Sequence, residues 1–199
     1  MSSTANNSRI KLDKINVLIV DDNQQSLDIL GQVLSGFGVR SIQKCESAKD
    51  AVKLVTTQVF DFIVTEANLA GMDGFELIKS IRRMQNQPNA YIPILLVAGH
   101  ARASHVHKAR DCGANFVVAK PITPKVLLER IFWVAKEDRM FIETANYLGP
   151  ERRFKREGPP IGMTGRRKED LHSELGEATT PNLSQDQINS LMKPMKVIL

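Results

Sequence analysis

Three acidic residues and one lysine stand where this chain could carry out phosphate or metal chemistry. Asp21 and Asp22 follow one short apolar run, Glu66 follows a second, and Lys120 follows a third. Carboxylates that converge on a small crevice repel one another and favour a hard divalent cation such as Mg²⁺. A lysine beside them could pair with Glu66 or hold an anion. The simpler alternative is that Asp21 and Asp22 cap the helix that follows them.

Between residues 13 and 138, short apolar runs alternate with helical patterns. Runs rich in Val and Ile, and one weaker run, predict five strands, at 15–20, 40–45, 61–65, 92–98 and 115–119. Apolar residues spaced by three and four predict five helices, and Ser47 and Thr123 are expected N-caps. The alternation predicts an α/β fold, a doubly wound five-stranded parallel sheet of order 2-1-3-4-5, which is a flavodoxin-like arrangement. Ligands of such folds bind beyond the carboxyl ends of the strands, where the acids and Lys120 would meet.

The distribution of Gly, Pro and charge divides the chain into three parts. Residues 1–12 are rich in Ser, Asn and Thr, and we expect a flexible leader there. Residues 13–138 form the predicted domain. Residues 139–199 read as a largely disordered tail, since Gly and Pro clusters interrupt any regular pattern. Eight basic and three acidic residues in 139–168 precede two basic and five acidic residues in 169–199, so the tail is basic and then acidic.

Composition excludes several classes of protein. Hydrophobic residues make up 42% and charged residues 25% of the 199, which is enough apolar material for a core and rules out wholesale disorder. No apolar run approaches the roughly 18–20 residues of a membrane span, and the start lacks the apolar region of a secretory signal. Cys45 and Cys112 are too few for a disulfide scaffold or a zinc site. We therefore expect a cytoplasmic protein.

Three segments carry a resemblance to a known family. VLIVDDN at 17–23, FDFIVTEANLAGMDG at 60–74 and GANFVVAKP at 113–121 together resemble the receiver domain of bacterial two-component response regulators, over about 13–138. The resemblance implies that the acid pair binds magnesium with the residue that ends the third strand. It also implies that this residue, an aspartate in the family, accepts a phosphoryl group from a histidine kinase. A hydroxyl ending the fourth strand and an aromatic on the fifth would report the phosphorylation.

The chain departs from that family pattern at the positions that change on phosphorylation. Glu66 replaces the phosphoacceptor aspartate, Ala98 replaces the hydroxyl residue, and Val117 replaces the aromatic switch residue. Phe116 lies one position early and would face the other side of the sheet. The acid pair and Lys120 match the family. The metal ligands implied here are therefore Asp21, Asp22 and Glu66, with weak magnesium binding.

Glutamate is one methylene longer than aspartate, so its carboxylate would enter the space that a phosphoryl group needs. A displacement on the order of 1 Å can cost about a hundredfold in rate, and position 98 lacks a donor to the phosphoryl oxygens. We therefore expect negligible phosphoryl transfer to Glu66. Two consequences stay open at this stage. Glu66 could imitate the phosphorylated state with a fixed charge, although a phosphoryl group carries nearly twice that charge, or the site could be a silent scaffold.

The end of the tail contains a short amphipathic pattern. In NLSQDQINSLM at 182–192, Ser184 and Gln187 form a capping box, and Ile188, Leu191 and Met192 fall on one helical face. The string is similar to the segment by which the flagellar motor switch protein captures its chemotaxis regulator. Such a helix, predicted over 183–192, could occupy the output face of its own receiver or that of another regulator.

These observations favour a stand-alone receiver-type regulator that acts by protein association rather than by catalysis. The expected partner is a histidine kinase, another regulator or a flagellar or chemotaxis component. Two other classes of protein are alternatives. One is a magnesium-dependent phosphoryl hydrolase, which the adjacent acid pair does not favour because such hydrolases use a spaced pair. The other is a nucleic-acid-binding regulator that uses the basic tail, for which a solvated tail is the preferred interpretation.

Overall fold

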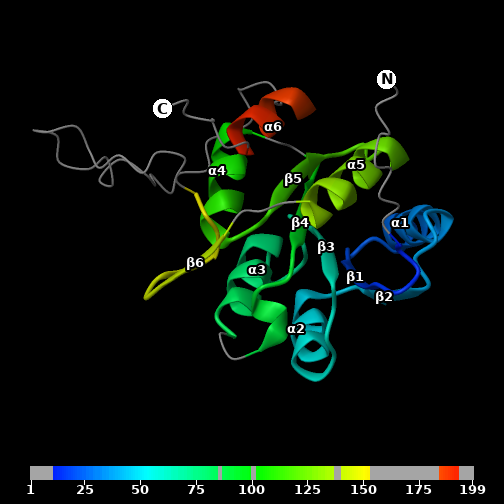
Figure 1. Cartoon of the computed structure of the whole chain (residues 1–199), viewed down its shortest axis with the longest axis horizontal. Helices are drawn as coiled ribbons and strands as arrows, with labels where there is room; N and C mark the ends of the chain where they lie inside the picture. Colours follow the sequence, from blue (N-terminus) through cyan, green and yellow to red (C-terminus); the bar gives the residue numbers. More distant parts are fainter. Residues whose placement is uncertain (1–10, 85–86, 100–101, 137–139, 153–183, 193–199) are drawn as a thin grey trace, which may run out of the picture.

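The computed structural model of the chain describes residues 11–84, 87–99, 102–136, 140–152 and 184–192. Its centre is a parallel sheet of five strands, β1 (Asn16–Val20), β2 (Ser41–Cys45), β3 (Phe62–Glu66), β4 (Ile94–Ala98) and β5 (Phe116–Ala119). The strand order is β2-β1-β3-β4-β5, as the sequence predicts (Figure 1). All five predicted strands are therefore confirmed, with ends that shift by one or two residues.

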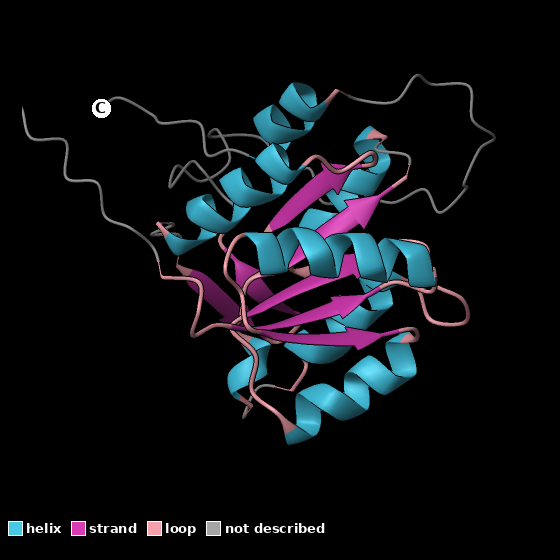
Figure 2. Ribbon diagram, turned by 90° about the vertical axis from the view of Figure 1, so that its right-hand side faces the viewer, coloured by secondary structure: helices cyan, strands magenta, loops and turns pink. Residues whose placement is uncertain are grey.

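Helices cover both faces of this sheet (Figure 2). The helices α1 (Gln24–Gly36) and α5 (Pro124–Ala135) pack on one face. The helices α2 (Ala48–Thr57), α3 (Gly74–Arg82) and α4 (Ala103–Cys112) pack on the other, and a short 3₁₀ turn, η1 (Pro88–Ala90), precedes β4. The two layers divide the buried residues into two apolar clusters, one on each side of the sheet.

The strand sequences account for this three-layer arrangement. Along β1, Val17 and Ile19 pack toward α1 and α5, whereas Leu18 and Val20 pack toward α2 and α3. A strand that is buried on both faces needs a continuous apolar run rather than an alternating one, and β1, β3 and β4 have such runs. The predicted caps are also confirmed. The backbone N–H of Asp50 donates to Ser47 Oγ, and that of Val126 donates to Thr123 Oγ1.

An antiparallel hairpin follows the sheet, in a part of the chain that the sequence places in the disordered tail. Its strands are β6 (Phe141–Thr144) and β7 (Tyr147–Pro150), so the expectation of an unstructured tail fails for 141–150. Strand β7 contacts α3 and α4. A Cβ atom at Gly149 would lie only 2.8 Å from the Cα of Gly113, so glycine lets β7 cross the end of α4. The sequence alone suggests that Gly149 and Pro150 interrupt regular structure. In the fold, Gly149 instead allows the backbones of β7 and of the end of α4 to pack closely.

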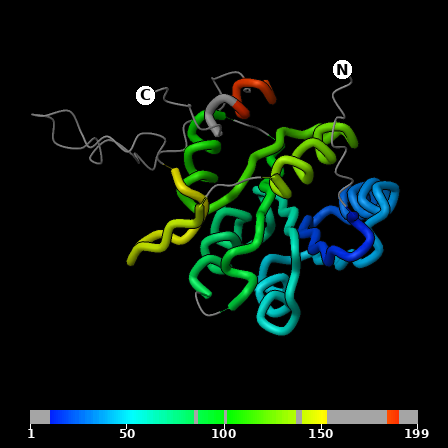
Figure 3. The backbone as a smooth tube through the Cα atoms, viewed as in Figure 1, coloured from blue at the N-terminus to red at the C-terminus, as the bar shows by residue number. Residues whose placement is uncertain are grey.

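The last described element is α6 (Gln185–Met192), which lies against α4 and β5 (Figures 1 and 3). The helix predicted over 183–192 is therefore present. Its capping box is confirmed in both directions, since Ser184 N donates to Gln187 Oε1 and Gln187 N donates to Ser184 Oγ. In the described parts of the chain, no helix is both long enough and apolar enough to cross a membrane.

Candidate functional site

Asp21, Glu66 and Lys120 meet at the carboxyl edge of the sheet. They stand at the ends of β1, β3 and β5, and the parallel register brings these ends together. Lys120 Nζ lies 2.5 Å from Glu66 Oε2 and 3.2 Å from Asp21 Oδ2. Both carboxylates are buried, with 5% exposure for Glu66 and 2% for Asp21. The predicted convergence of these three residues is confirmed.

The second oxygen of Glu66 is also engaged. Glu66 Oε1 accepts hydrogen bonds from the backbone N–H groups of Ala67 (2.9 Å) and Asn68 (3.1 Å). One carboxylate thus receives two amide donors on one oxygen and an ammonium group beside the other. The loop is held in place by Gly74, whose N–H donates to Ala67 O and whose missing Cβ would lie 2.1 Å from Glu66 O. The side chain of Glu66 is therefore tightly fixed.

The two aspartates behave differently from each other. Asp21 Oδ1 accepts from Asn23 N, and its other oxygen faces Lys120. Asp22 is exposed, and its Oδ2 accepts from Ala70 N at 3.1 Å, across the crevice. Neither aspartate is the N-cap of α1, because Asn23 holds that position and accepts from Ser26 N. The alternative in which the acid pair only caps the helix is therefore not what the structure shows.

Lys120 supplies positive charge to this site. Its burial would lower its pKa, but hydrogen bonds and charge from Glu66 and Asp21 outweigh that effect, and the pKa is raised. The ammonium group is thus held in its charged form and offsets part of the negative charge of the two buried carboxylates. One lysine facing two carboxylates leaves a net negative charge, to which the nearby Asp22 adds.

The donor chemistry of this edge suits magnesium, since it consists of carboxylate oxygens. The arrangement is not a ready cage, however. Among the residues that the structure describes, no three His, Cys, Asp or Glu side chains come together as a metal group. The carboxylates of Asp21 and Glu66 form ion pairs with Lys120, and the carboxylate of Asp22 accepts a hydrogen bond from Ala70 N. A metal ion would have to displace these contacts.

The two positions that the family resemblance marks as switch positions are both apolar and lie on neighbouring strands. Ala98 ends β4 with 2% exposure, and Val117 is buried in β5 with 1% exposure. Val117 belongs to the cluster under α4, whereas Phe116 belongs to the cluster under α5. There Phe116 packs edge-on against Trp133, with ring centroids 4.7 Å apart. The predicted placement of Phe116 on the opposite face of the strand is confirmed.

Comparisons with known proteins agree with this architecture. A family model described as the response regulator receiver domain matches residues 17–132. The chain belongs to that family. It is 30% identical over 115 residues to the chemotaxis protein CheY-3 of Vibrio cholerae, an alignment that covers 58% of this chain and 87% of that protein.

Solved receiver structures give the same result. The chemotaxis protein CheY4 of Vibrio cholerae is 27% identical with a TM-score of 0.56, over 60% of this chain and 98% of that one. The receiver domain of the histidine kinase CKI1 from Arabidopsis thaliana, complexed with Mg²⁺, is 26% identical with a TM-score of 0.55, over 61% and 94%. The match to the family model ends at residue 132, before the hairpin and α6.

A second region of the receiver is formed by α4, β5 and α5, and α6 covers it. Ile188 is fully buried in the cluster that contains Val106, Ala109 and Val117. Ile188 therefore packs on its own receiver, which is one of the two surfaces that the sequence suggests for this helix, and its binding of another protein stays a prediction. The backbone of Leu191 and Met192 belongs to α6, but the side chains of both lie outside the described residues.

Sequence reasoning missed two polar residues of this contact. The amide of Gln185 bonds to the backbone of β5, with Nε2 donating to Val117 O and Oε1 accepting from Ala119 N. Asn189 Oδ1 accepts from Gln185 Nε2 and from Arg130 Nη2 of α5. Their four-residue spacing could have indicated a shared helical face, but nothing in the sequence showed that this face would meet a sheet edge.

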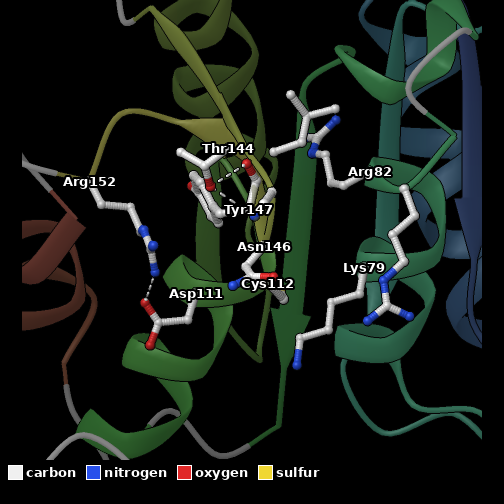
Figure 4. Close-up of a pocket in the computed structure, with 11 residues that line it drawn as sticks. Lys79, Arg82, Asp111, Cys112, Thr144, Asn146, Tyr147 and Arg152 are labelled. Atoms are coloured by element: carbon white, nitrogen blue, oxygen red, sulfur yellow. Dashed lines mark hydrogen bonds and ion pairs between the residues drawn. The ribbon is translucent and has the colours of Figure 1, made fainter. Parts of the chain in front are cut away.

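A cavity of about 450 Å³ separates α3 and α4 from the hairpin (Figure 4). Arg82 is buried at one side and donates to the carbonyl oxygens of Gly113, Ala90 and Ile92. Burial lowers the pKa of this guanidinium to about 10. At the other side, Arg152 forms an ion pair with Asp111 at 2.5 Å. The guanidinium of Arg82 also lies 5.0 Å from the centre of the Phe141 ring of the hairpin. Arg82 and Arg152 thus each link the receiver to the segment that contains the hairpin.

Proposed function

We propose that this protein is a regulator of two-component signalling that acts by protein association and does not use phosphorylation of Glu66. One observation carries the proposal. Both oxygens of the buried Glu66 carboxylate are already engaged, one in an ion pair with Lys120 at 2.5 Å and the other by two backbone N–H donors. For either oxygen to attack phosphorus, the carboxylate would have to give up contacts that fix the Glu66 side chain.

The surroundings of Glu66 also disfavour an acyl phosphate. A phosphoryl group there would need donors for its oxygens, but Lys120 is shared between two carboxylates and Ala98 offers only a methyl group. Phosphoryl transfer requires the attacking oxygen to lie in line with the phosphorus atom, and a displacement of that oxygen by about 1 Å can cost about a hundredfold in rate. We therefore assign to Glu66 a fixed charge that keeps the receiver in one permanent arrangement. That charge is about half of a phosphoryl group's, so the arrangement need not equal the phosphorylated one.

Magnesium binding at Asp21, Asp22 and Glu66 is part of the proposal, with low affinity. Support comes from the donor type and from the related CKI1 receiver, whose structure is a complex with Mg²⁺. When bound, the metal would neutralise carboxylate charge. Lys120 already performs part of that task, so a divalent ion competes with an internal cation and binds more weakly than it would without the lysine.

The partner is proposed to be a protein, and the contact surface to be the one formed by α4, β5 and α5. A histidine kinase, another regulator and a component of the flagellar or chemotaxis machinery all belong to this class. A role in chemotaxis is favoured because the relative from Vibrio cholerae carries that name. The buried switch positions Ala98 and Val117 lie on β4 and β5, which connect the acidic site to this surface.

Intact-mass spectrometry after incubation with acetyl phosphate and magnesium tests the proposal. The wild-type protein should gain no phosphoryl group, whereas Glu66→Asp should gain one slowly and Glu66→Asp/Ala98→Thr should gain one faster. Glu46→Asp makes the same chemical change at an exposed glutamate and should behave as wild type. A phosphoryl group on Glu66 of the wild-type protein would refute the proposal.

A further inference from the structure

Strand β5 is the edge of the five-stranded sheet, and within the described part of the chain its outer side presents backbone groups that no neighbouring strand pairs. The N–H groups of Asn115 and Lys120 bond inward, to Ile94 O and Ala98 O. In the strand between them, the carbonyl of Val117 and the N–H of Ala119 point the other way, toward α6. A strand edge of this kind is a template for binding another chain.

The side chain of Gln185 occupies that template. Its amide donates to Val117 O at 3.2 Å and accepts from Ala119 N at 3.0 Å. A single primary amide thus reproduces the donor and acceptor pair that a neighbouring strand would offer. Both bonds depend on the amide group, because a carboxylate could not donate and an ammonium group could not accept.

The rest of the α6 helix contacts the adjoining surfaces. Ile188, three residues after Gln185, is completely buried against the apolar cluster beneath α4. Asn189 links Gln185 to Arg130 of α5, with Arg130 Nη2 to Asn189 Oδ1 at 2.7 Å. One short helix therefore contacts α4, β5 and α5 together. Gln185 bonds to the edge of β5, Ile188 packs in the apolar cluster beneath α4, and Asn189 bonds to Arg130 of α5.

We propose that α6 is an internal occupant that closes the α4–β5–α5 surface of its own receiver, so that an external partner must displace it. This inference rests on the proposed function and names the partner class. The surface accepts a capped helix that carries glutamine in its first turn, a β-branched residue three positions later and asparagine next. Residues 184–189 of this chain, Ser-Gln-Asp-Gln-Ile-Asn, have that pattern. Attachment to the same chain gives the segment an effective concentration on the order of millimolar.

The test uses the full-length protein and a fluorescent synthetic peptide of residues 182–199. The variants Ile188→Asp and Gln185→Ala release α6 without changing the receiver surface. Asp186→Asn is the matched control at an exposed position of the same helix. For a peptide affinity of about 100 µM, taken as the working value, an internal competitor at about 1 mM occupies the site roughly ten to one. On that basis Ile188→Asp should bind the peptide about tenfold more tightly than wild type. Gln185→Ala should fall between them, and Asp186→Asn should equal wild type.

Amide NMR of the Ile188→Asp variant identifies the bound surface. The peptide should shift the backbone signals of Val117 and Ala119, where the Gln185 amide would bind again. Equal peptide affinity of wild type and Ile188→Asp would overturn the inference, as would the absence of binding to Ile188→Asp. A wild-type dimer in sedimentation that Ile188→Asp converts to monomer would also overturn it, because the occupant would then be a second copy. Phosphorylation of Glu66 would refute the proposed function while leaving this result intact.

Discussion

Replacement of Lys120 by methionine removes the cation that faces two buried carboxylates. The substitution keeps most of the aliphatic volume and deletes the charge. Asp21 and Glu66, 2% and 5% exposed, are then left without the ammonium group that lies within 3.2 Å of both. We therefore expect Lys120→Met to lower the free energy of unfolding by much more than an ordinary surface substitution.

The magnitude follows from the burial of the two sides of the pair. Removing one partner of a fully buried ion pair costs about 3–5 kcal/mol, since the other charge stays buried and unpaired. The Lys120 side chain is 34% exposed, so water screens part of the interaction. We expect a loss of about 2–3 kcal/mol for Lys120→Met. Glu66→Gln should cost about 1 kcal/mol, because Lys120 retains Asp21.

Urea unfolding followed by circular dichroism and by the fluorescence of Trp133 measures these losses. Lys44→Met is a matched control. Lys44 pairs with Asp28 at 2.7 Å and is 38% exposed, close to the value for Lys120, but its partner is 49% exposed. A surface pair of that kind contributes about 0–1 kcal/mol. The two lysines thus differ mainly in the burial of the carboxylates that they face.

The double variant Lys120→Met/Glu66→Gln completes a thermodynamic cycle. It should cost about 1–2 kcal/mol less than the sum of the single changes, because a neutral amide at position 66 no longer suffers from the missing lysine. If the losses add to within about 0.5 kcal/mol, or if Lys120→Met costs no more than Lys44→Met, the two residues are not coupled. The description of a fixed Glu66–Lys120 pair would then be refuted.

Three further outcomes are expected. The raised pKa of Lys120 contributes stability that is complete below its ordinary value of 10.5 and is lost as pH rises through the folded-state value. The stability difference between wild type and Lys120→Met, measured by urea unfolding, should therefore shrink above about pH 10.5 and stay constant between about pH 7 and 9. Burial raises the pKa of Cys112 to about 12, so iodoacetamide at about pH 8 should leave Cys112 unmodified in native protein and modify it in urea, as mass spectrometry would show. Arg82→Met deprives three carbonyl groups of a donor and should cost about 3 kcal/mol and expose the hairpin to limited proteolysis, whereas the exposed neighbour variant Arg83→Met should stay within about 0.5 kcal/mol of wild type.

The sheet could be predicted from sequence because its strands are buried on both faces. That burial leaves continuous apolar runs such as 17–20, and the order of alternation then allows few topologies. The convergence of Asp21, Glu66 and Lys120 followed from the same argument, since the carboxyl ends of parallel strands share one edge. The distances and the number of backbone donors to Glu66 did not follow, because they depend on the loop after β3.

The hairpin could not be predicted, because its stability comes from contacts that are distant in sequence. The ring of Phe141 lies 5.0 Å from the guanidinium carbon of Arg82, and Gly149 fits against Gly113. Read locally, Gly149 and Pro150 indicate only a break. The buried state of Arg82 was equally hidden, since arginine on a helix ordinarily reads as a solvated residue.

Some features of α6 could be predicted from the sequence and others could not. Its capping box and its apolar spacing are local, and both were visible in the sequence. The contact of Gln185 with the β5 edge is not local, because it joins residues that are 66 and 68 positions apart. A helical pattern can therefore predict that a face exists, while the identity of the surface that it covers requires the fold.

The most direct test of the account is an amide NMR titration of the wild-type protein with magnesium and then with beryllofluoride, a stable phosphoryl mimic. Magnesium should cause small shifts confined to Asp21, Asp22 and Glu66, and beryllofluoride should add none at Ala98 or Val117. Large beryllofluoride-dependent shifts that reach β4 and β5 would contradict the account, because the receiver would still respond to a phosphoryl group.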